Sequence, residues 1–567
     1  MRDGSRTRIK LVGILIFLFG LALLGRLFYL QIIKHDYYSD KANAQYIGKS
    51  PQMFNRGDIY FKKKDGQLIS GATIKNGFLV ALIPKQITNP EDVYNKISKI
   101  IDVDRENFFK KINKKNDPYE EIAHRLNEDE KKEIEKLNID GLRLYPESWR
   151  YYPAKNLAAN VIGFVGFKDN DLLGRYGIEY KYDEVLKGEN GNNNVNFFAE
   201  ILSKIKKELK GGGNESGSVV LSIDPVVQSF LENTIQKNFD NLKAEQAGGL
   251  IIDPKTGRII AMAIKPDFDP NNYSKVKDQS LFVNPMVENI FEMGSIMKPL
   301  TIAAAIDQNK ITPQTTYFDK GYVDIDSRRL NNFDKKGRGK VDMQEVLNQS
   351  LNTGAVFAEQ QLGHEKFREY IKNYGFGSKT EIDLPGEIAG RISTLESKRD
   401  VEFATASFGQ NIAVTPIEMI IALSSLANGG FIVRPYVVDE IKYENGDIVK
   451  TEPKIIKQVL KKETTEILSG MLSKVYDSIL GGQFKIDHYS VSAKTGTAQM
   501  TKDGKYLEGD QNLHTFFGYA PSYNPKFLTF LFLINPQGVR FASVSLTPPF
   551  SDITKFLINY YEIPPDR

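Results

Sequence analysis

The chain has 567 residues, of which 41% are hydrophobic and 11% aromatic, so it can fill the cores of two or three domains. The formal net charge is only +4 and there is no cysteine, which excludes disulfides and thiolate metal sites. Basic runs such as residues 62–64 are typical of solvated surfaces, and no nucleic-acid-binding module is present. The composition therefore indicates a multidomain globular protein without a DNA or RNA partner.

An apolar segment lies close to the N-terminus. Residues 11–25 carry no charge and the apolar character resumes after Arg26, so residues 11–30 are long enough to span a membrane as a helix. The preceding residues 1–10 contain four basic residues and only one acidic residue, which predicts a cytoplasmic tail and an extracytoplasmic remainder. A cleaved signal peptide is the alternative, but the small-residue site at 42–44 lies far downstream. We expect a retained single-pass anchor in the cell membrane.

Two domains are predicted after this anchor. The first occupies residues 31–210, and its highly charged segment 92–138 is predicted to be helical. The glycine-rich run 210–217 is typical of a flexible boundary. The second domain is predicted over residues 218–560. It begins with a helix for which Asp224 is the cap and the following proline is the first residue.

The strongest chemical signal is a Ser-x-x-Lys motif formed by Ser295 and Lys298. Gly294 permits a tight turn, and the Ala/Ile-rich run 300–306 is typical of a buried helix. Pro299 is tolerated only in the first turn of a helix, so the helix should begin near Ser295, at the positive end of its dipole. Lys298 then lies on the same face, where burial would lower its pKa and let it accept a proton.

Two further motifs follow in the chain. A Ser-x-Asn motif at Ser350 and Asn352 comes after a helical pattern, which predicts a helix end and a loop directing two polar side chains into a cleft. A Lys-Thr-Gly-Thr motif at 494–497 continues a strand-like alternation, and further strands are predicted over 514–520 and 527–534. The glycine of this motif would let a ligand approach the backbone closely.

Copies of these motifs elsewhere have simpler explanations. Ser203 and Ser274 also begin Ser-x-x-Lys, but both lie in lysine-rich stretches typical of a surface. Ser522 begins a second Ser-x-Asn, and a second Lys-Thr-Gly at 255–257 lies between two apolar runs, as a hairpin turn does. The order and the structural setting therefore single out the motifs that begin at 295, 350 and 494.

These motifs resemble the signatures of class B penicillin-binding proteins, which are peptidoglycan D,D-transpeptidases. The resemblance covers nearly the whole chain. It includes short segments at residues 56–60, 177–179, 247–258, 269–271, 374–377, 383–387, 409–410, 415–416 and 427–430. It implies an α+β fold: a transpeptidase domain like that of penicillin-binding proteins and β-lactamases, an elongated N-terminal pedestal (dimerisation-like) domain and one N-terminal transmembrane helix.

The resemblance also implies a serine acyl-enzyme mechanism. The four catalytic candidates are Ser295, Lys298, Ser350 and Lys494, and the substrate-binding candidates are Asn352, Thr495, Gly496 and Thr497. The serine of the first motif would attack the carbonyl of a D-Ala-D-Ala peptide bond while its lysine takes the proton. The other two catalytic candidates would relay a proton to the leaving D-alanine, and the sequence leaves their division of labour open.

The substrate-binding candidates have separate implied roles. Asn352 would bind the donor peptide, and the third motif would hold its terminal carboxylate. The backbone N–H groups of Ser295 and Thr497 would form the oxyanion hole. No cofactor is implied. His364 begins half of a zinc motif, but Arg368 stands at the position of the second histidine, so no metal site is predicted.

The family implies stem peptides and β-lactams as ligands, and a polytopic membrane glycosyltransferase and other divisome proteins as partners. Residues 350–354 and the length of the pedestal favour a septal, cell-division role over an elongation role. A D,D-carboxypeptidase is an alternative, although the large pedestal and single anchor favour the transpeptidase. A non-catalytic β-lactam sensor or divisome scaffold is a further one, but the additional spans and the protease motif expected of a sensor are not found in the sequence.

Overall fold

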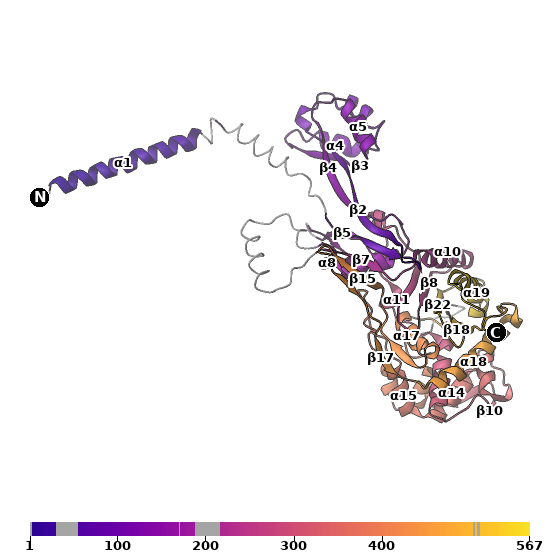
Figure 1. The fold of residues 1–567 in the computed structure, drawn as a ribbon. Coiled ribbons are helices and arrows are strands. Elements are labelled where there is room, and N and C mark those ends of the chain that lie inside the picture. The colour runs from indigo at the N-terminus through magenta and orange to yellow at the C-terminus, as the bar shows by residue number, and fades with distance from the viewer. Residues whose placement is uncertain are drawn as a thin grey trace. The chain divides into compact units, whose positions relative to one another are not determined.

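The computed structural model describes residues 3–29, 34, 55–168, 171–187, 216–502, 505–506 and 511–567 (Figure 1). These residues form two compact units. The first contains Ile74–Arg150 and the described N-terminal residues. The second contains Arg56–Thr73 and the described residues from Tyr151 onward, and it includes all three motifs.

The second unit is built on a five-stranded antiparallel sheet with the strand order β18-β21-β22-β8-β9. The last strands of the chain therefore pair with the first strands of the predicted catalytic domain. The predicted turn at 255–257 and the two predicted strands after the third motif are confirmed. The strand bounds are β8 (Gln246–Ile252), β9 (Ile259–Lys265), β18 (Ser492–Gln499), β21 (Asn512–Ala520) and β22 (Phe527–Ile534).

Each face of this sheet is covered by helices. Successive side chains of a strand point to opposite faces, so neighbouring residues enter different cores. Phe516 and Leu531 enter one core together with side chains of α10 (Pro225–Leu242) and α19 (Ala542–Tyr560). Phe517 and Phe530 enter a second core with side chains of the α12 helix, described below. This mixed arrangement is the predicted α+β class. Asp224 caps α10 as predicted, since its side chain accepts bonds from the first backbone N–H groups.

The segments between β9 and β18 form the helical part of this unit and carry the first two motifs. Two short strand pairs, β10–β13 and β11–β12, lie between α12 and α13 in the chain. The helices are α11 (Pro285–Glu288), α12 (Lys298–Asp307), α13 (Met343–Asn348), α14 (Asn352–Leu362), α15 (His364–Asn373), α16 (Asp400–Ala406), α17 (Pro416–Ala427) and α18 (Lys462–Ser478). The strands are β10 (Thr316–Asp319), β11 (Tyr322–Ile325), β12 (Arg328–Asn331), β13 (Gly339–Asp342), β14 (Phe431–Val433) and β17 (Ile455–Gln458). The short strands β19 (Thr501–Lys502) and β20 (Lys505–Tyr506) follow β18.

A second sheet joins the start of the pedestal region to the catalytic domain, because β1 pairs with the beginning of β2 and with β7, and β7 pairs with β15. The Arg56 guanidinium donates to Glu179 at 2.6 Å and to Asp183 at 2.7 Å, and Arg56 and Glu179 are buried. Two of the family-like segments are thus held together by a buried ion pair. The elements are β1 (Ile59–Lys62), β2 (Leu68–Leu82), α6 (Ala159–Ile162), β5 (Val165–Lys168), β6 (Asp171–Gly174), α7 (Gly177–Lys181), α8 (Asp183–Lys187), β7 (Gly217–Leu221), β15 (Val438–Tyr443) and β16 (Ile448–Lys450).

The first unit has its own small core around Val80, Phe108 and Ile134. The predicted helical character of residues 92–138 is correct for three helices but wrong for β3, which pairs with the end of β2. Pairing with a distant strand decided the conformation of that segment, and local composition does not report such pairing. The elements are α3 (Pro90–Ile97), α4 (Arg105–Ile112), β3 (Glu120–Leu126), α5 (Glu128–Lys136) and β4 (Leu142–Tyr151).

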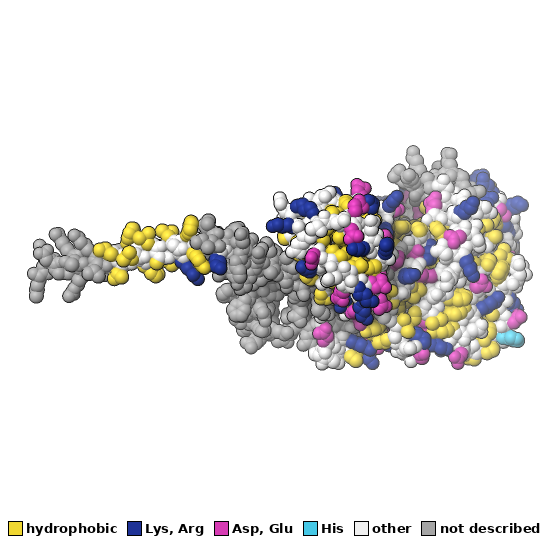
Figure 2. Space-filling model, turned by 90° about the horizontal axis from the view of Figure 1, so that it is seen from above, with side chains coloured by type: hydrophobic (Ala, Val, Ile, Leu, Met, Phe, Trp, Pro, Cys, Tyr) yellow, Lys and Arg dark blue, Asp and Glu magenta, His cyan; other side chains and the backbone are white. Residues whose placement is uncertain are grey.

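The N-terminal residues form one long helix, α1 (Asp3–Phe28). Figure 2 shows apolar side chains along the part of α1 whose side chains are described, and Ile14, Phe17 and Leu24 are more than half exposed. Within the described residues, no helix has the length and apolar character needed to cross a membrane. The predicted anchor at 11–30 includes positions outside the described side chains.

Candidate active site

Ser295 lies in a turn that leads directly into a buried helix. The turn is a 3-10 helix, η6 (Gly294–Met297), and α12 follows it with Pro299 in its first turn, as predicted. Side chains three residues apart eclipse each other in a 3-10 turn, so Ser295 and Lys298 lie on the same side. Lys298 is completely buried, whereas Ser295 is partly exposed. The serine is thus accessible and the lysine is shielded from water.

The η6 turn packs directly against strand β18, which carries the third motif. Gly294 has a φ of 63°, and a Cβ on it would lie 3.2 Å from the carbonyl oxygen of Thr497. A Cβ on Gly496 would lie 2.8 Å from the carbonyl oxygen of Met293 and 2.3 Å from Oγ1 of Thr515. The absence of a side chain at Gly496 thus lets the strand approach the η6 turn. The sequence had suggested only that a ligand could approach the backbone there.

The second motif meets the first through Lys298. Its Nζ donates to the carbonyl oxygen of Ser350 at 2.5 Å and lies 3.2 Å from Ser350 Oγ. Ser350 lies between α13 and α14, as predicted, and has a φ of 56°. That left-handed conformation is uncommon for a residue with a side chain, and such strain tends to persist at functional sites. The amine of Lys298, the hydroxyl of Ser350 and the η6 turn that carries Ser295 therefore lie close together.

Both lysines of the site are buried, which shifts their protonation. Burial lowers the pKa of Lys298 well below its ordinary value, and the nearby charge of Lys494 lowers it further. Burial alone lowers the pKa of Lys494 to about 7. The Nζ of Lys494 donates to the carbonyl oxygen of Thr495 at 3.2 Å. The effect of Lys494 on Lys298 follows from the proximity of the first and third motifs.

Of the remaining sequence candidates, Thr495 and Thr497 lie on β18 and Asn352 begins α14. The amide Nδ2 of Asn352, the first residue of α14, donates to the carbonyl oxygen of Asn331 at 2.8 Å. The Oγ1 of Thr497 accepts a bond from the backbone N–H of Ala542, the first residue of α19, at 3.1 Å. β18 is the edge strand of its sheet, so a substrate backbone can lie alongside it.

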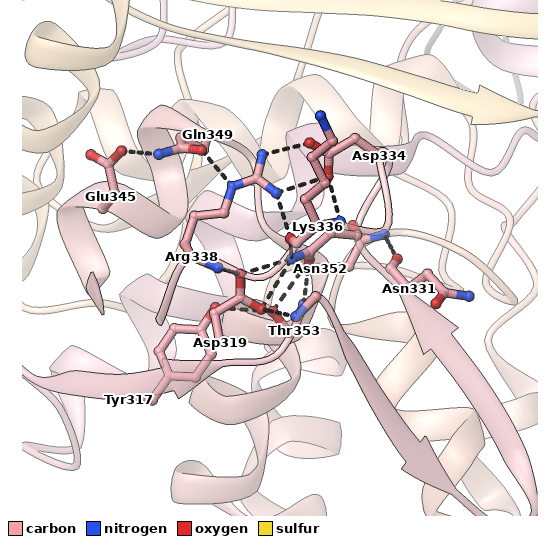
Figure 3. Close-up of polar contacts among 12 residues, drawn as sticks. Tyr317, Asp319, Asn331, Asp334, Lys336, Arg338, Glu345, Gln349, Asn352 and Thr353 are labelled. Carbon is pink, nitrogen blue, oxygen red and sulfur yellow. Dashed lines mark hydrogen bonds and ion pairs between the residues drawn. The ribbon is translucent and has the colours of Figure 1, made fainter. Parts of the chain in front are cut away.

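Sequence reasoning missed a buried polar cluster behind the second motif. Asp319, Asn332 and Thr353 are hydrogen-bonded to one another, and Figure 3 shows Asp319 beside Thr353 with Asn352 adjacent. These residues are far apart in the chain and belong to no short motif. The aspartate-lysine-glycine sequence at 319–321 signals only a turn. Among the described residues, no group of three or more His, Asp or Glu side chains could hold a metal ion.

Known protein families match most of this chain. The model of the penicillin-binding protein transpeptidase domain matches residues 247–555, and that of the penicillin-binding protein dimerisation domain matches residues 52–220. The chain belongs to the class B penicillin-binding proteins. The family predicted from the three motifs is thereby confirmed. The chain is a peptidoglycan D,D-transpeptidase of the serine type.

Individual relatives agree along nearly their full length. Stage V sporulation protein D of Bacillus subtilis is 32% identical over 96% of this chain and 84% of its own. The peptidoglycan D,D-transpeptidase FtsI homolog of Mesostigma viride is 29% identical over 99% of this chain and 96% of its own. The crystal structure of penicillin-binding protein 3 from Mycobacterium tuberculosis has a TM-score of 0.65 and 26% identity, and the match covers 74% of this chain and 92% of that one.

Proposed function

We propose that this penicillin-binding protein cross-links stem peptides through an ester on Ser295. The Oγ of Ser295 attacks the carbonyl carbon of the D-Ala-D-Ala bond, and Lys298 accepts the hydroxyl proton. The C–N bond breaks and D-alanine leaves with a proton. An amine of a second stem peptide then attacks the ester, which forms the cross-link and returns the proton to the serine. No cofactor takes part in this sequence of steps.

The observation that carries this proposal is the buried Lys298. An amine accepts a proton only when it is neutral, and burial beside a second lysine lowers the pKa of Lys298 and so favours the neutral form. Its bond to Ser350 also supplies a route for the proton toward the leaving group. Lys494 has a lowered pKa of about 7, so it can release a proton near neutrality and assist Ser350 in this step.

The substrate-binding roles rest on the position of the third motif. The terminal carboxylate of the donor peptide would bind Lys494, Thr495 and Thr497, with Gly496 keeping the strand close to the serine turn. Asn352 would bind the donor peptide from the opposite side, through the amide hydrogen that Asn331 leaves free. The backbone N–H groups of Ser295 and Thr497 would hold the developing oxyanion.

Acylation by a penicillin tests the assignment directly. Penicillin-binding protein 3 of Mycobacterium tuberculosis has been solved in complex with aztreonam and with ampicillin. We infer that β-lactams acylate Ser295 of this chain in the same manner as the substrate. Intact-mass analysis after penicillin treatment should show one adduct, and peptide mapping should place it on Ser295. The Ser295→Ala variant should show none; an adduct on that variant would remove Ser295 from the mechanism.

We further propose that α1 anchors the protein in the cell membrane, with residues 1–10 in the cytoplasm and the catalytic domain outside. Beyond the cytoplasmic tail, residues 11–28 of α1 extend about 27 Å at 1.5 Å per residue, which is close to the hydrocarbon thickness. Apart from Arg26 in the last turn, its described side chains carry no charge, and the large apolar ones are exposed, a pattern that favours a lipid environment. The anchor at 11–30 would precede a pedestal at 31–210 and a transpeptidase domain at 218–560; the family matches over 52–220 and 247–555 support these two domains.

We propose a septal role, in association with a polytopic glycosyltransferase and other divisome proteins. The sequence of the second motif, the pedestal length and relatives named FtsI support it. Cell-wall synthesis during sporulation is a second candidate, because one full-length relative is named for that process. Imaging a fluorescent fusion in dividing and sporulating cells separates the two, and a signal along the side wall would contradict both.

A further inference from the structure

Residues 316–342, which lie between the first two motifs in the chain, contact the residues on both sides of Ser350. On the N-terminal side, the Nε of Arg338 donates to the side-chain oxygen of Gln349, which immediately precedes Ser350. Arg338 is itself held by two bonds to Asp334. Figure 3 shows this chain of contacts running from Asp334 through Arg338 to Gln349. One side of the Ser350 loop is therefore tied to the segment that precedes it.

On the C-terminal side, the tie is a buried cluster centred on Asp319. Its carboxylate accepts bonds from Thr353 Oγ1 at 2.8 Å and from Asn332 Nδ2 at 3.0 and 3.1 Å. It also accepts from the backbone N–H groups of Gly321 at 2.9 Å and Arg338 at 3.0 Å. All of these donors are neutral groups, and Asp319 is only 1% exposed. A carboxylate accepts on both oxygens, so it can satisfy several such donors together.

This cluster reaches the substrate-binding asparagine through the backbone. Asn332 Oδ1 accepts from the N–H of Thr353, and the carbonyl of Asn331, one residue earlier, accepts from the side chain of Asn352. Fixing Asn332 against Asp319 therefore fixes the acceptor that orients the amide of Asn352. The first turn of α14 is held at the same time through Thr353.

Ser350 lies between these two ties, in a left-handed conformation. A serine keeps that conformation only where the surrounding contacts over-determine it. We propose that Asp319, Asn332 and Thr353 are positioning residues for the transpeptidase reaction: they hold Ser350 and Asn352 in the arrangement that meets Lys298. This inference rests on the proposed function of Ser295 and assigns a purpose to a segment that carries none of the motifs.

Substitutions at two positions test the inference in the full-length protein. In Asp319→Asn, an NH₂ group must face N–H and O–H donors, so the cluster cannot close. Thr353→Val keeps the shape of the side chain and removes its hydroxyl, whereas Thr353→Ser keeps the hydroxyl. We expect acylation of Ser295 by a fluorescent penicillin to slow by about ten-fold or more in Asp319→Asn and Thr353→Val, since small misplacements of reacting groups cost that much.

Two matched variants serve as controls. Thr353→Ser should recover most of the rate. Asp324→Asn makes the same chemical change at an exposed carboxylate of β11, which pairs with Arg329 and touches no motif. Its acylation rate should stay within about two-fold of the wild type, as surface substitutions usually do. Melting temperatures of all four variants show which of them fold.

A pH profile separates positioning from general stability. The charge that acts on Lys298 from the neighbouring strand is that of Lys494. If the Ser350 loop shifts and admits water, the pKa of Lys298 rises, so the acidic limb of the acylation profile moves to higher pH. Unchanged rates and profiles in folded Asp319→Asn and Thr353→Val would overturn the inference. If Asp319→Asn does not fold, the two Thr353 variants decide. Absence of label on wild-type Ser295 would instead overturn the proposed function.

Discussion

The site buries two lysines within electrostatic reach of each other. Lys298 is fully buried and Lys494 is 2% exposed. Burying an ammonium group is costly, and a second positive charge increases the cost. Each amine therefore spends more of its time neutral, and a neutral amine can accept a proton from a serine. The features that destabilise the folded state at this point are those that the proposed chemistry requires.

This cost predicts a pH-dependent gain in stability for Lys494→Met. The pKa of Lys494 is about 7 in the folded state, below its unfolded value of about 10.4. Between these two pH values the unfolded chain binds more protons than the folded chain, so the stability of the wild type rises with pH. Lys494→Met should therefore melt a few degrees higher than the wild type at pH 7, and the gain should vanish near pH 10.5. Thermal melts at both pH values measure this.

The same variant should lose its reaction with penicillin. As a control, Lys379→Met removes an exposed lysine and should leave the melting temperature nearly unchanged at both pH values. A wild-type protein that is as stable as Lys494→Met at pH 7 would show that the buried amine carries no penalty.

At the scale of elements, the decisive contact is between the η6 turn and the edge strand β18. Two glycines, Gly294 and Gly496, let the two backbones approach each other, and the hydroxyl of Thr515 ties the turn to the sheet by donating to Met293 at 3.0 Å. The η6 turn and the third motif are thus packed directly together. The distance between them depends on the absence of a Cβ at the two glycines.

Gly496→Ala should therefore slow acylation without unfolding the protein. The new Cβ would lie 2.3 Å from Thr515 Oγ1 and 2.8 Å from the Met293 carbonyl oxygen, so the strand and the turn must separate. We expect the acylation rate to fall by at least about ten-fold, because the proposed oxyanion donors and the serine no longer align. Stopped-flow labelling with a fluorescent penicillin measures the rate.

Gly470→Ala is the matched control on helix α18. Its Cβ would meet only the hydroxyl of Tyr523, at 3.1 Å, which is the end of a movable side chain. Alanine favours a helix by roughly 0.5–1 kcal/mol over glycine, so this variant should be as active as the wild type and slightly more stable. Equal rates for the two glycine variants would mean that the close approach at Gly496 is not needed.

At the scale of the whole molecule, the sheet brings together motifs that lie far apart in the chain. The strand order β18-β21-β22-β8-β9 brings the end of the chain beside the start of the predicted catalytic domain. Helix α12 fills one face of that sheet and carries Lys298 to the second motif. The compact unit around this sheet also includes Arg56–Thr73, so part of the predicted pedestal packs with the transpeptidase region.

The proposed anchor gives a prediction for the intact protein. The full chain should sediment with membranes and resist extraction by high salt and by carbonate, because apolar contacts of a spanning helix are insensitive to both. A variant lacking residues 1–30 should appear in the soluble fraction and still react with penicillin. Release of the full chain by salt alone would point to peripheral, charge-based attachment.

The sequence alone determined the chemistry and the class of protein. Local rules sufficed there: Pro299 and Gly294 indicate the helix start at Ser295, Asp224 caps a helix, and apolar alternation predicts the strands after the third motif. The charged segment 92–138 shows where such rules end, since β3 forms only through pairing with β2.

The tertiary structure alone decided how these parts act together. It placed Lys298 against Ser350, brought Gly496 against the serine turn, and assembled Asp319, Asn332 and Thr353 behind the second motif. Each of these contacts joins residues far apart in the chain, and the burial that lowers the pKa of each lysine belongs to the packed core as a whole. Residue type and spacing carry no record of such contacts, because they arise only when distant segments exclude water together.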